Sequence, residues 1–166
     1  MHKQASDYVY EEFHLWRKDK NNFDILEIGS LDINGSVRTF LSPFANTYHG
    51  IDMQEGPGVD EIADASEFVR PDSFDVVVCC ETFEHTPAWK QIIQNAMTSL
   101  RDGGIFITTM AGEGRPPHSA IDTNEIREWE HYANIGEWEL RQTLKGFFKE
   151  SVTNVLGTDL RAWAVK

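Results

Sequence analysis

The chain has 166 residues, of which 40% are apolar and 25% are charged, a composition that excludes a disordered or fibrous protein and a length that suits one domain. Asp and Glu outnumber Lys and Arg by 27 to 15, which gives a net charge of −12. This charge disfavours nucleic acid as a partner, because affinity for a phosphate backbone comes largely from cationic side chains.

The N-terminal segment lacks the basic-then-apolar pattern of a signal peptide, and no apolar run reaches the roughly 18 residues that a membrane span requires. We therefore expect a soluble, cytoplasmic protein with no membrane partner. Cys79 and Cys80 are adjacent in an apolar run, where neighbouring side chains of a strand point to opposite faces. We expect both thiols to be reduced and buried.

Hydrophobic patterning predicts five strands in the first two thirds of the chain, over residues 23–29, 47–51, 59–63, 74–80 and 105–110. The fourth of these has five apolar residues in succession after Asp75, as a strand buried on both faces requires, so we place it at the centre of the sheet. Helices are predicted over residues 7–20, from the capping residue Ser36 to Pro43, from Pro87 to Gly103, and around Leu140 to Phe147.

The last third begins with a polar stretch, residues 111–136, that matches no single element. Two apolar segments follow at 148–155 and 160–165, and the turn residues between them predict a hairpin. Alternating strands and helices followed by a hairpin indicate a parallel sheet with helices on both faces and a late antiparallel strand. Ligands of such sheets bind outside the carboxyl ends of the strands, so site residues are expected just after each strand.

Gly29 and Gly35 bracket the turn after the first strand, where missing side chains allow a ligand to approach the backbone or simply allow close helix packing. A dinucleotide fingerprint counted from Gly29 needs glycine where Leu31 and Asn34 stand, so that match fails. Asp52 follows the second strand near the offset at which an acidic residue binds ribose hydroxyls. Together these features favour a nucleoside ligand.

Polar residues also follow the third and fourth strands. Asp64 and Ala65 offer an acceptor and a backbone donor that suit an adenine edge; the alternative is that Asp64 caps a helix over residues 66–69. Glu81, Glu84 and His85 crowd the end of the fourth strand.

Five stretches in this order resemble the class I S-adenosylmethionine-dependent methyltransferases, in particular the small-molecule, type 11-like branch with a Glu-His pair after strand four. They are residues 25–29 (Ile-Leu-Glu-Ile-Gly), 50–52 (Gly-Ile-Asp), 63–65 (Ala-Asp-Ala), 74–78 with 81–85 (Phe-Asp-Val-Val-Val and Glu-Thr-Phe-Glu-His), and 100–104 (Leu-Arg-Asp-Gly-Gly). The resemblance implies a Rossmann-like α/β three-layer sandwich with a mostly parallel seven-stranded sheet and an antiparallel C-terminal hairpin strand. It also implies one catalytic domain over residues 23–166, preceded by a helical segment over residues 1–22.

The resemblance further implies S-adenosylmethionine as the cofactor. Glu27 and Gly29 then line its methionine end, Asp52 holds the ribose, Met53 packs on the adenine, Asp64 and Ala65 bind the adenine edge, and Cys80 offers a backbone carbonyl. The turn departs from the family pattern, since Leu31-Asp32 stands where a second glycine is frequent, and this leaves the contacts of Asp32 and Asn34 open. The predicted cofactor-binding residues are Glu27, Gly29, Asn34, Gly35, Asp52, Met53, Asp64, Ala65 and Cys80.

Methyl transfer from a sulfonium is a direct displacement, so the protein mainly aligns the donor and the acceptor. Where the acceptor must lose a proton, His85 is the candidate base and Glu81 the alternative; the structural alternative is that His85 opens the helix near Pro87. Arg115 and His118, in the loop after the fifth strand, are predicted to bind an acidic acceptor or, alternatively, to serve loop geometry.

Trp129, Tyr132 and Trp138 form either an acceptor wall or part of the core. His118 and His131 do not stand at metal-ligand spacings, so the sequence predicts no metal. The function that follows is methyl transfer from S-adenosylmethionine to a small-molecule acceptor. Two alternatives are a non-catalytic S-adenosylmethionine-binding or nucleoside-binding Rossmann-like module and an NAD-dependent oxidoreductase, the latter in conflict with the first turn.

Overall fold

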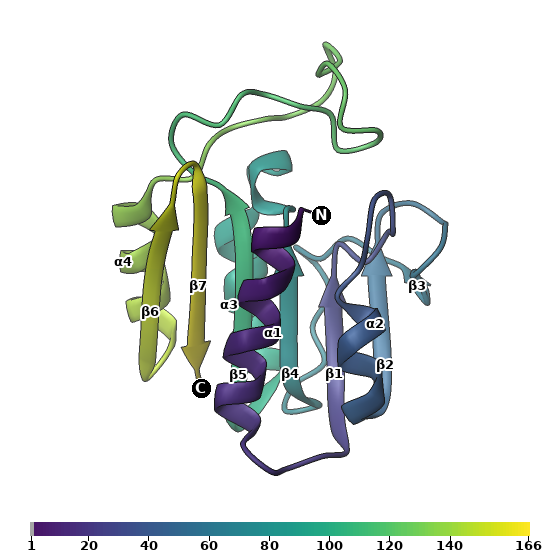
Figure 1. Cartoon of the computed structure of the whole chain (residues 1–166), viewed down its shortest axis with the longest axis vertical. Helices are drawn as coiled ribbons and strands as arrows, with labels where there is room; N and C mark the ends of the chain where they lie inside the picture. The colour runs from purple at the N-terminus through teal and green to yellow at the C-terminus, as the bar shows by residue number, and fades with distance from the viewer. Residues whose placement is uncertain (1) are drawn as a thin grey trace.

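A computed structural model describes residues 2–166 and shows a seven-stranded sheet in the order β3-β2-β1-β4-β5-β7-β6 (Figure 1). The strands are β1 (Phe23–Ile28), β2 (Ala45–Asp52), β3 (Glu61–Ile62), β4 (Phe74–Cys80), β5 (Leu100–Ala111), β6 (Glu150–Leu156) and β7 (Asp159–Val165). The α-helices are α1 (Lys3–Arg17), α2 (Arg38–Leu41), α3 (Trp89–Ser99) and α4 (Glu137–Phe147), and two short 3-10 helices are η1 (Ser42–Phe44) and η2 (Phe83–His85).

The sheet has the predicted mixture of strand directions. Strands β1 to β5 pair in parallel, whereas β7 runs antiparallel to both of its neighbours, β5 and β6. The order reverses between β1 and β4, because the chain first builds outward to β3 and then returns to the other side of β1. This confirms the Rossmann-like α/β fold, with β4 at the centre as its continuous apolar run predicted.

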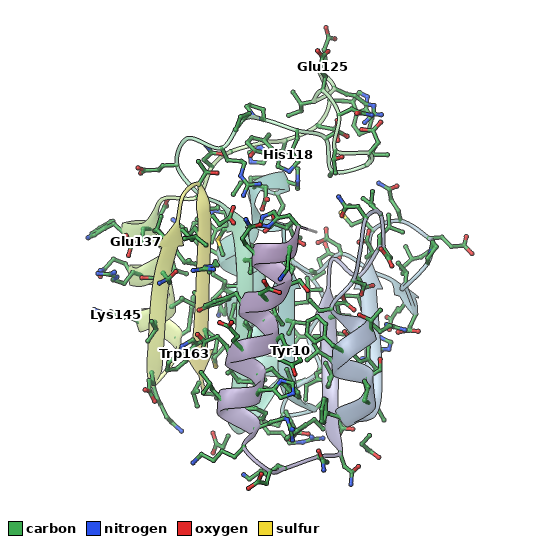
Figure 2. All side chains as sticks on the ribbon, in the orientation of Figure 1. Tyr10, His118, Glu125, Glu137, Lys145 and Trp163 are labelled. Carbon is green, nitrogen blue, oxygen red and sulfur yellow. The ribbon has the colours of Figure 1, made fainter. Side chains whose placement is uncertain are left out.

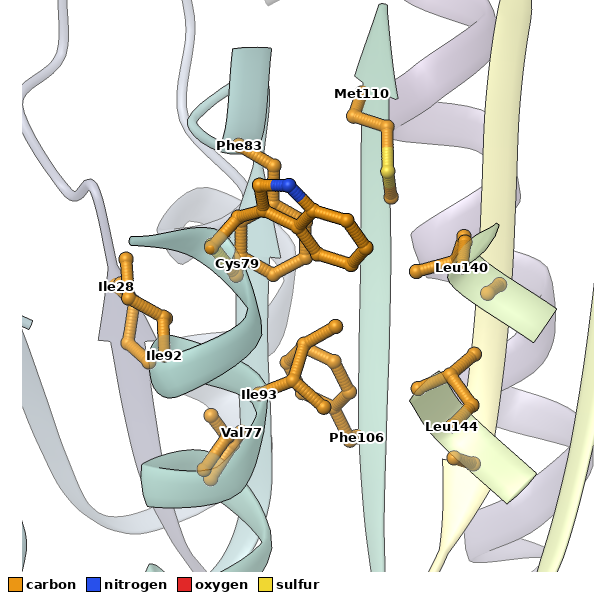
Figure 3. Packing of buried hydrophobic residues seen from close by; sticks show 14 of the residues in the cluster. Ile28, Val77, Cys79, Phe83, Ile92, Ile93, Phe106, Met110, Leu140 and Leu144 are labelled. Atoms are coloured by element: carbon orange, nitrogen blue, oxygen red, sulfur yellow. The ribbon is translucent and has the colours of Figure 1, made fainter. Parts of the chain in front are cut away.

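Two apolar layers hold helices against the sheet. Helices α1 and α2 cover one face, and α3 and α4 cover the other (Figure 1). Residues of β4 alternate between these layers, since Val76 and Val78 pack beneath α1 while Val77 and Cys79 pack beneath α3. Figure 3 shows the second layer, in which Ile93 of α3 lies close to Phe106 of β5 and the leucines of α4.

The structure corrects the predicted elements at several points. The predicted third strand is reduced to Glu61–Ile62. Just before it, Asp60 N donates to Gly50 O (2.8 Å) while the Asp60 side chain accepts from Gly50 N (2.7 Å), so one backbone bond and one side-chain bond join this pair. No helix forms over residues 66–69, where Asp64 Oδ1 instead accepts bonds from both N and Oγ of Ser66 and closes a turn. Helix α1 begins at Lys3, earlier than predicted, because the His2 ring caps Ala5 N (3.3 Å).

Charged side chains join three strands at their amino ends. Arg101 of β5 donates from Nη1 to Asp75 of β4 (2.9 Å) and from Nη2 to Asp24 of β1 (2.9 Å). Asp24 also accepts bonds from Asn46 and Thr47, and hydrogen bonding, chiefly from Thr47, lowers its pKa. This cluster fixes the end of the sheet that lies away from the predicted site.

Cys79 and Cys80 form no disulfide within the described part of the chain; Cys79 is buried and Cys80 is half-buried. Among the helices of residues 2–166, none combines the length and the apolar character needed to cross a bilayer.

Candidate functional site

A cavity of about 450 Å³ opens at the carboxyl ends of β1, β2 and β4, where the strand order reverses. Its volume is in the range of small-molecule sites. The structure brings every predicted site residue to this cavity: Glu27, Gly29, Asn34, Gly35, Asp52, Met53, Asp64, Ala65, Cys80, Glu81, His85, Arg115 and His118. Their roles stay predictions, since position alone does not assign them.

The turn after β1 requires glycine at position 29. Gly29 has φ of +72°, and a Cβ there would stand 2.1 Å from Oγ1 of Thr82, the residue that follows β4 by two positions. The side chain of Asp32, whose contacts the sequence left open, accepts a bond from Gly35 N (2.7 Å) and closes the same turn. Gly29 and Gly35 both line the cavity, so a ligand can approach the backbone of the turn closely at these two positions.

Asp52 is held by the backbone at the end of β2. Its Oδ2 accepts a bond from Leu31 N (3.2 Å) and its Oδ1 accepts one from Gln54 N (3.1 Å). Each carboxylate oxygen keeps a further lone pair for a ligand hydroxyl. Met53 beside it is 71% exposed, so an apolar ligand group could cover it.

Glu27 is a buried carboxyl at the end of β1. Its Oε1 accepts a bond from Ser36 Oγ (3.1 Å), and its Oε2 accepts one from Tyr48 OH (2.8 Å). Burial raises its pKa to about 7, against the lowering effect of these two bonds and of Arg38. Arg38 Nε lies 3.9 Å from Oε2, and the carboxyl, oriented by these contacts, suits a cationic ligand group. Tyr48 was missed because a tyrosine inside a strand carries no local functional signal.

The segment of Asp64 and Ala65 is anchored from α3. Buried Asn95 donates from Nδ2 to the carbonyls of Ala65 (3.0 Å) and Ser66 (2.8 Å). Asn95 was also missed, since a single polar residue inside a helix carries no local functional signal. The anchored segment borders the cavity beside Ile92.

Glu81 follows β4 in a left-handed backbone conformation, with φ of +50°. Such conformations in residues other than glycine are uncommon and gather at functional sites. Its Oε1 accepts a bond from Thr109 Oγ1 (2.9 Å), while its Oε2 lies 3.6 Å from His2 Nε2 and 4.0 Å from Arg115 Nη1. The carboxylate is thus fixed at the mouth of the cavity.

Arg115 is engaged by the β6–β7 hairpin. It forms an ion pair with Asp159 and donates from Nε to Thr158 Oγ1 (3.0 Å). These contacts neutralise much of its charge and favour the alternative interpretation, in which Arg115 holds the loop after β5 in place.

Glu84, His85 and His118 gather beside Glu81. Glu84 is fully buried; its Oε1 accepts a bond from Ala111 N (3.1 Å), and burial, followed by the charge of Glu81, raises its pKa to about 8. Burial also lowers the pKa of His85 to about 4, with a smaller effect from His118, so the imidazole is neutral near pH 7. One potential ligand atom from each of the three residues lies within 4.8 Å of the others.

Tyr132 covers these two histidines. Its ring centroid lies 5.5 Å from that of His85 and 5.1 Å from that of His118, whose own centroids are 5.1 Å apart. Figure 2 shows His118 in the loop above the carboxyl ends of the central strands. Trp129 and Trp138 are 71% and 75% exposed, so the suggestion that all three aromatic residues belong to the core is wrong.

Comparisons with known proteins agree with this geometry. A family model described as a methyltransferase domain matches residues 26–106, and no curated protein matches the chain. The chain is similar to a 1,6-didemethyltoxoflavin-N1-methyltransferase from Burkholderia thailandensis, solved with 1,6-didemethyltoxoflavin and S-adenosylhomocysteine, at 16% identity and a TM-score of 0.70, covering 99% of this chain and 77% of that one.

Two further solved structures have the same fold. One is an S-adenosylmethionine-dependent methyltransferase from Mesorhizobium loti, at 13% identity and a TM-score of 0.67, with 95% and 97% of the two chains covered. The other is phosphoethanolamine N-methyltransferase 2 from Haemonchus contortus, solved with phosphomonomethylethanolamine and S-adenosylhomocysteine, at 18% identity and a TM-score of 0.65, with 89% and 38% covered.

The matched model, which describes a methyltransferase domain, covers residues 26–106, just under half of the chain. The solved methyltransferases share the fold with this chain at 13 to 18% identity.

Proposed function

We propose that this chain transfers the methyl group of S-adenosylmethionine to a small-molecule acceptor, with the cofactor in the cavity at the ends of β1, β2 and β4. One observation carries the proposal: all nine predicted cofactor residues, together with Glu81 and His85 after β4, line a single cavity. The acceptor would approach from the side of Glu81 and His85.

The charge of the cavity suits this cofactor. Glu27, Asp52, Asp64 and Glu81 all line it, and S-adenosylmethionine carries an ammonium and a sulfonium. Glu27, held by Ser36 and Tyr48, would accept the ammonium, because a cation relieves the cost of ionising a buried carboxyl. Asp52, with free lone pairs beyond its two backbone bonds, would accept the ribose hydroxyls.

The transfer needs one bond to form and one to break. A lone pair on the acceptor attacks the methyl carbon, the carbon–sulfur bond breaks, and its electron pair stays on sulfur to give S-adenosylhomocysteine. An acceptor hydroxyl or ammonium also loses a proton. Neutral His85 is the proposed proton acceptor and Glu81, oriented by Thr109, is the alternative.

Two observations support a small acceptor. The loop over residues 112–134 crosses above the carboxyl ends of the central strands (Figure 1). It contributes His118, Ser119 and Ala120 to the lining of the cavity, which limits the space for a large substrate. Two structurally similar proteins were solved with small molecules bound, namely 1,6-didemethyltoxoflavin and phosphomonomethylethanolamine.

Titration calorimetry tests the cofactor assignment. We expect S-adenosylmethionine and S-adenosylhomocysteine to bind and NAD to give no heat. The variant Asp102→Ala, whose side chain is 87% exposed at the opposite end of β5, is the control for Asp52→Ala. Binding of NAD in place of S-adenosylmethionine would refute the proposal. If S-adenosylmethionine binds but a library of small nucleophiles yields no S-adenosylhomocysteine, the non-catalytic binding module is the better description.

A further inference from the structure

We infer that Glu84, His85 and His118 form a binding site for one divalent metal ion of the zinc type at the acceptor side of the cavity. The sequence did not indicate this site, because His118 stands 33 positions beyond His85, in a loop without regular structure. The inference goes beyond the proposed methyl transfer: with the ion bound, His85 is a ligand, and Glu81, the alternative named above, is then the proton acceptor.

The distances suit a shared ion. The three potential ligand atoms lie within 4.8 Å of one another. Zinc binds imidazole nitrogen and carboxylate oxygen at about 2.0 to 2.2 Å, which places ligand atoms about 3 to 4 Å apart around the ion. A small inward movement of the loop that carries His118 would therefore close the coordination sphere.

Glu84 supplies an independent observation, because its carboxyl is completely buried yet only half satisfied. Oε1 accepts a bond from Ala111 N (3.1 Å), while Oε2 has no hydrogen-bond partner among residues 2–166. A buried polar atom without a partner costs about 1 to 3 kcal/mol. A metal ion would satisfy Oε2, and the bond from Ala111 would orient the carboxylate for it.

The two imidazoles are also prepared to act as ligands. His85 Nδ1 is buried and lacks a partner within the described chain. His118 Nδ1 lies 3.3 Å from the carbonyl of Pro116, so a proton on that nitrogen leaves the lone pair of Nε2 for an ion. Tyr132 donates to the same carbonyl (3.3 Å) and packs on both rings, and Ala133 N bonds Glu84 O (2.8 Å).

The chemistry of the ligands selects the class of ion. Two imidazoles and one carboxylate favour Zn²⁺ and similar first-row metals over Mg²⁺ or Ca²⁺, which prefer oxygen ligands alone. Three protein ligands leave at least one position open. Since His85 and His118 both line the cavity, that position would face the space proposed for the acceptor and could bind an acceptor oxygen or nitrogen.

Metal titration of the untagged full chain tests the inference without cofactor, so its failure leaves the proposed methyl transfer intact. After removal of metal with a chelator, we expect one Co²⁺ per chain, seen as visible absorption bands, and displacement of Co²⁺ by Zn²⁺. His118→Ala should weaken the affinity at least about tenfold, given that even supporting residues of metal sites contribute about 10- to 100-fold. His131→Ala, which alters an exposed histidine of the same loop, is the matched control and should bind as the wild type does.

Glu84→Gln is the second variant for the Co²⁺ titration. It keeps the size of the side chain and an acceptor for Ala111 N but removes the carboxylate, so Co²⁺ binding should be lost while S-adenosylmethionine still binds. Should Glu84→Gln fail to fold, His118→Ala decides alone, since it alters a loop residue outside every helix and strand. The inference is overturned if the wild type does not bind one Co²⁺ per chain, or if His118→Ala binds Co²⁺ as tightly as the wild type.

Discussion

Replacing Glu27 with glutamine should remove a cost of folding that grows with pH. Burial raises the pKa of Glu27 from the ordinary 4.5 to about 7, so the folded chain holds a proton that the unfolded chain has released between these values. The contribution of Glu27 to the free energy of unfolding is therefore largest below pH 4.5 and falls as the pH rises from 4.5 through about 7. A factor of ten in acid dissociation is worth about 1.4 kcal/mol, so the wild type loses about 3 kcal/mol across this range. The amide introduced by Glu27→Gln carries no charge at any pH and avoids that loss.

Urea unfolding at about pH 4 and pH 8 measures the effect. The free energy of unfolding of Glu27→Gln minus that of the wild type should increase by about 3 kcal/mol from the lower to the higher pH. The change of this difference with pH contains no contribution from the other titrating groups, which both proteins share. It also contains none from a pH-independent change in the bonds to Ser36 and Tyr48. Glu67→Gln, on an exposed residue, is the control and should show no such increase. A difference that stays constant or decreases would refute the assignment of Glu27 as a buried carboxyl of raised pKa.

Three further variants test the turn, the cofactor contact and the proposed base. Gly29→Ala should lower the free energy of unfolding by about 2 to 5 kcal/mol, because the new Cβ meets Thr82 Oγ1 at a left-handed position; adding Thr82→Ala should recover part of that loss in urea unfolding. Asp52→Ala should raise the dissociation constant of S-adenosylmethionine about 5- to 150-fold, corresponding to about 1 to 3 kcal/mol, in calorimetry; an unchanged constant would remove Asp52 from the site. His85→Ala should slow S-adenosylhomocysteine production while sparing cofactor affinity, and equal loss of both would indicate a structural role.

The central strand was the most predictable element, because burial on both faces is visible as the continuous run from Val76 to Cys80. The third strand was least predictable. Its apolar residues suggested five positions, but the strand has two, and just before it the Asp60 side chain accepts the hydrogen bond of Gly50 N. Such a contact depends on Gly50, ten residues earlier, and leaves no periodic signal.

The candidate site likewise contains residues that the sequence predicted and residues that it missed. Asp52 and Asp64 could be predicted because parallel strands deliver the residues that follow them to one edge of the sheet. Tyr48, which bonds Glu27, and Asn95, which anchors Ala65, act through partners far away in sequence. The same is true of the grouping of His118 with Glu84, since a loop without periodicity gives no indication of where it folds back.

The ion pairs of Arg101 have a consequence for how this protein can change. They join Asp24 and Asp75 at one rim of the sheet, while the cavity opens at the other, about 20 Å away along a seven-residue strand. Substitutions this far apart usually act additively. Substitutions that change heat resistance at one rim can therefore accumulate independently of substitutions that change ligand preference at the other.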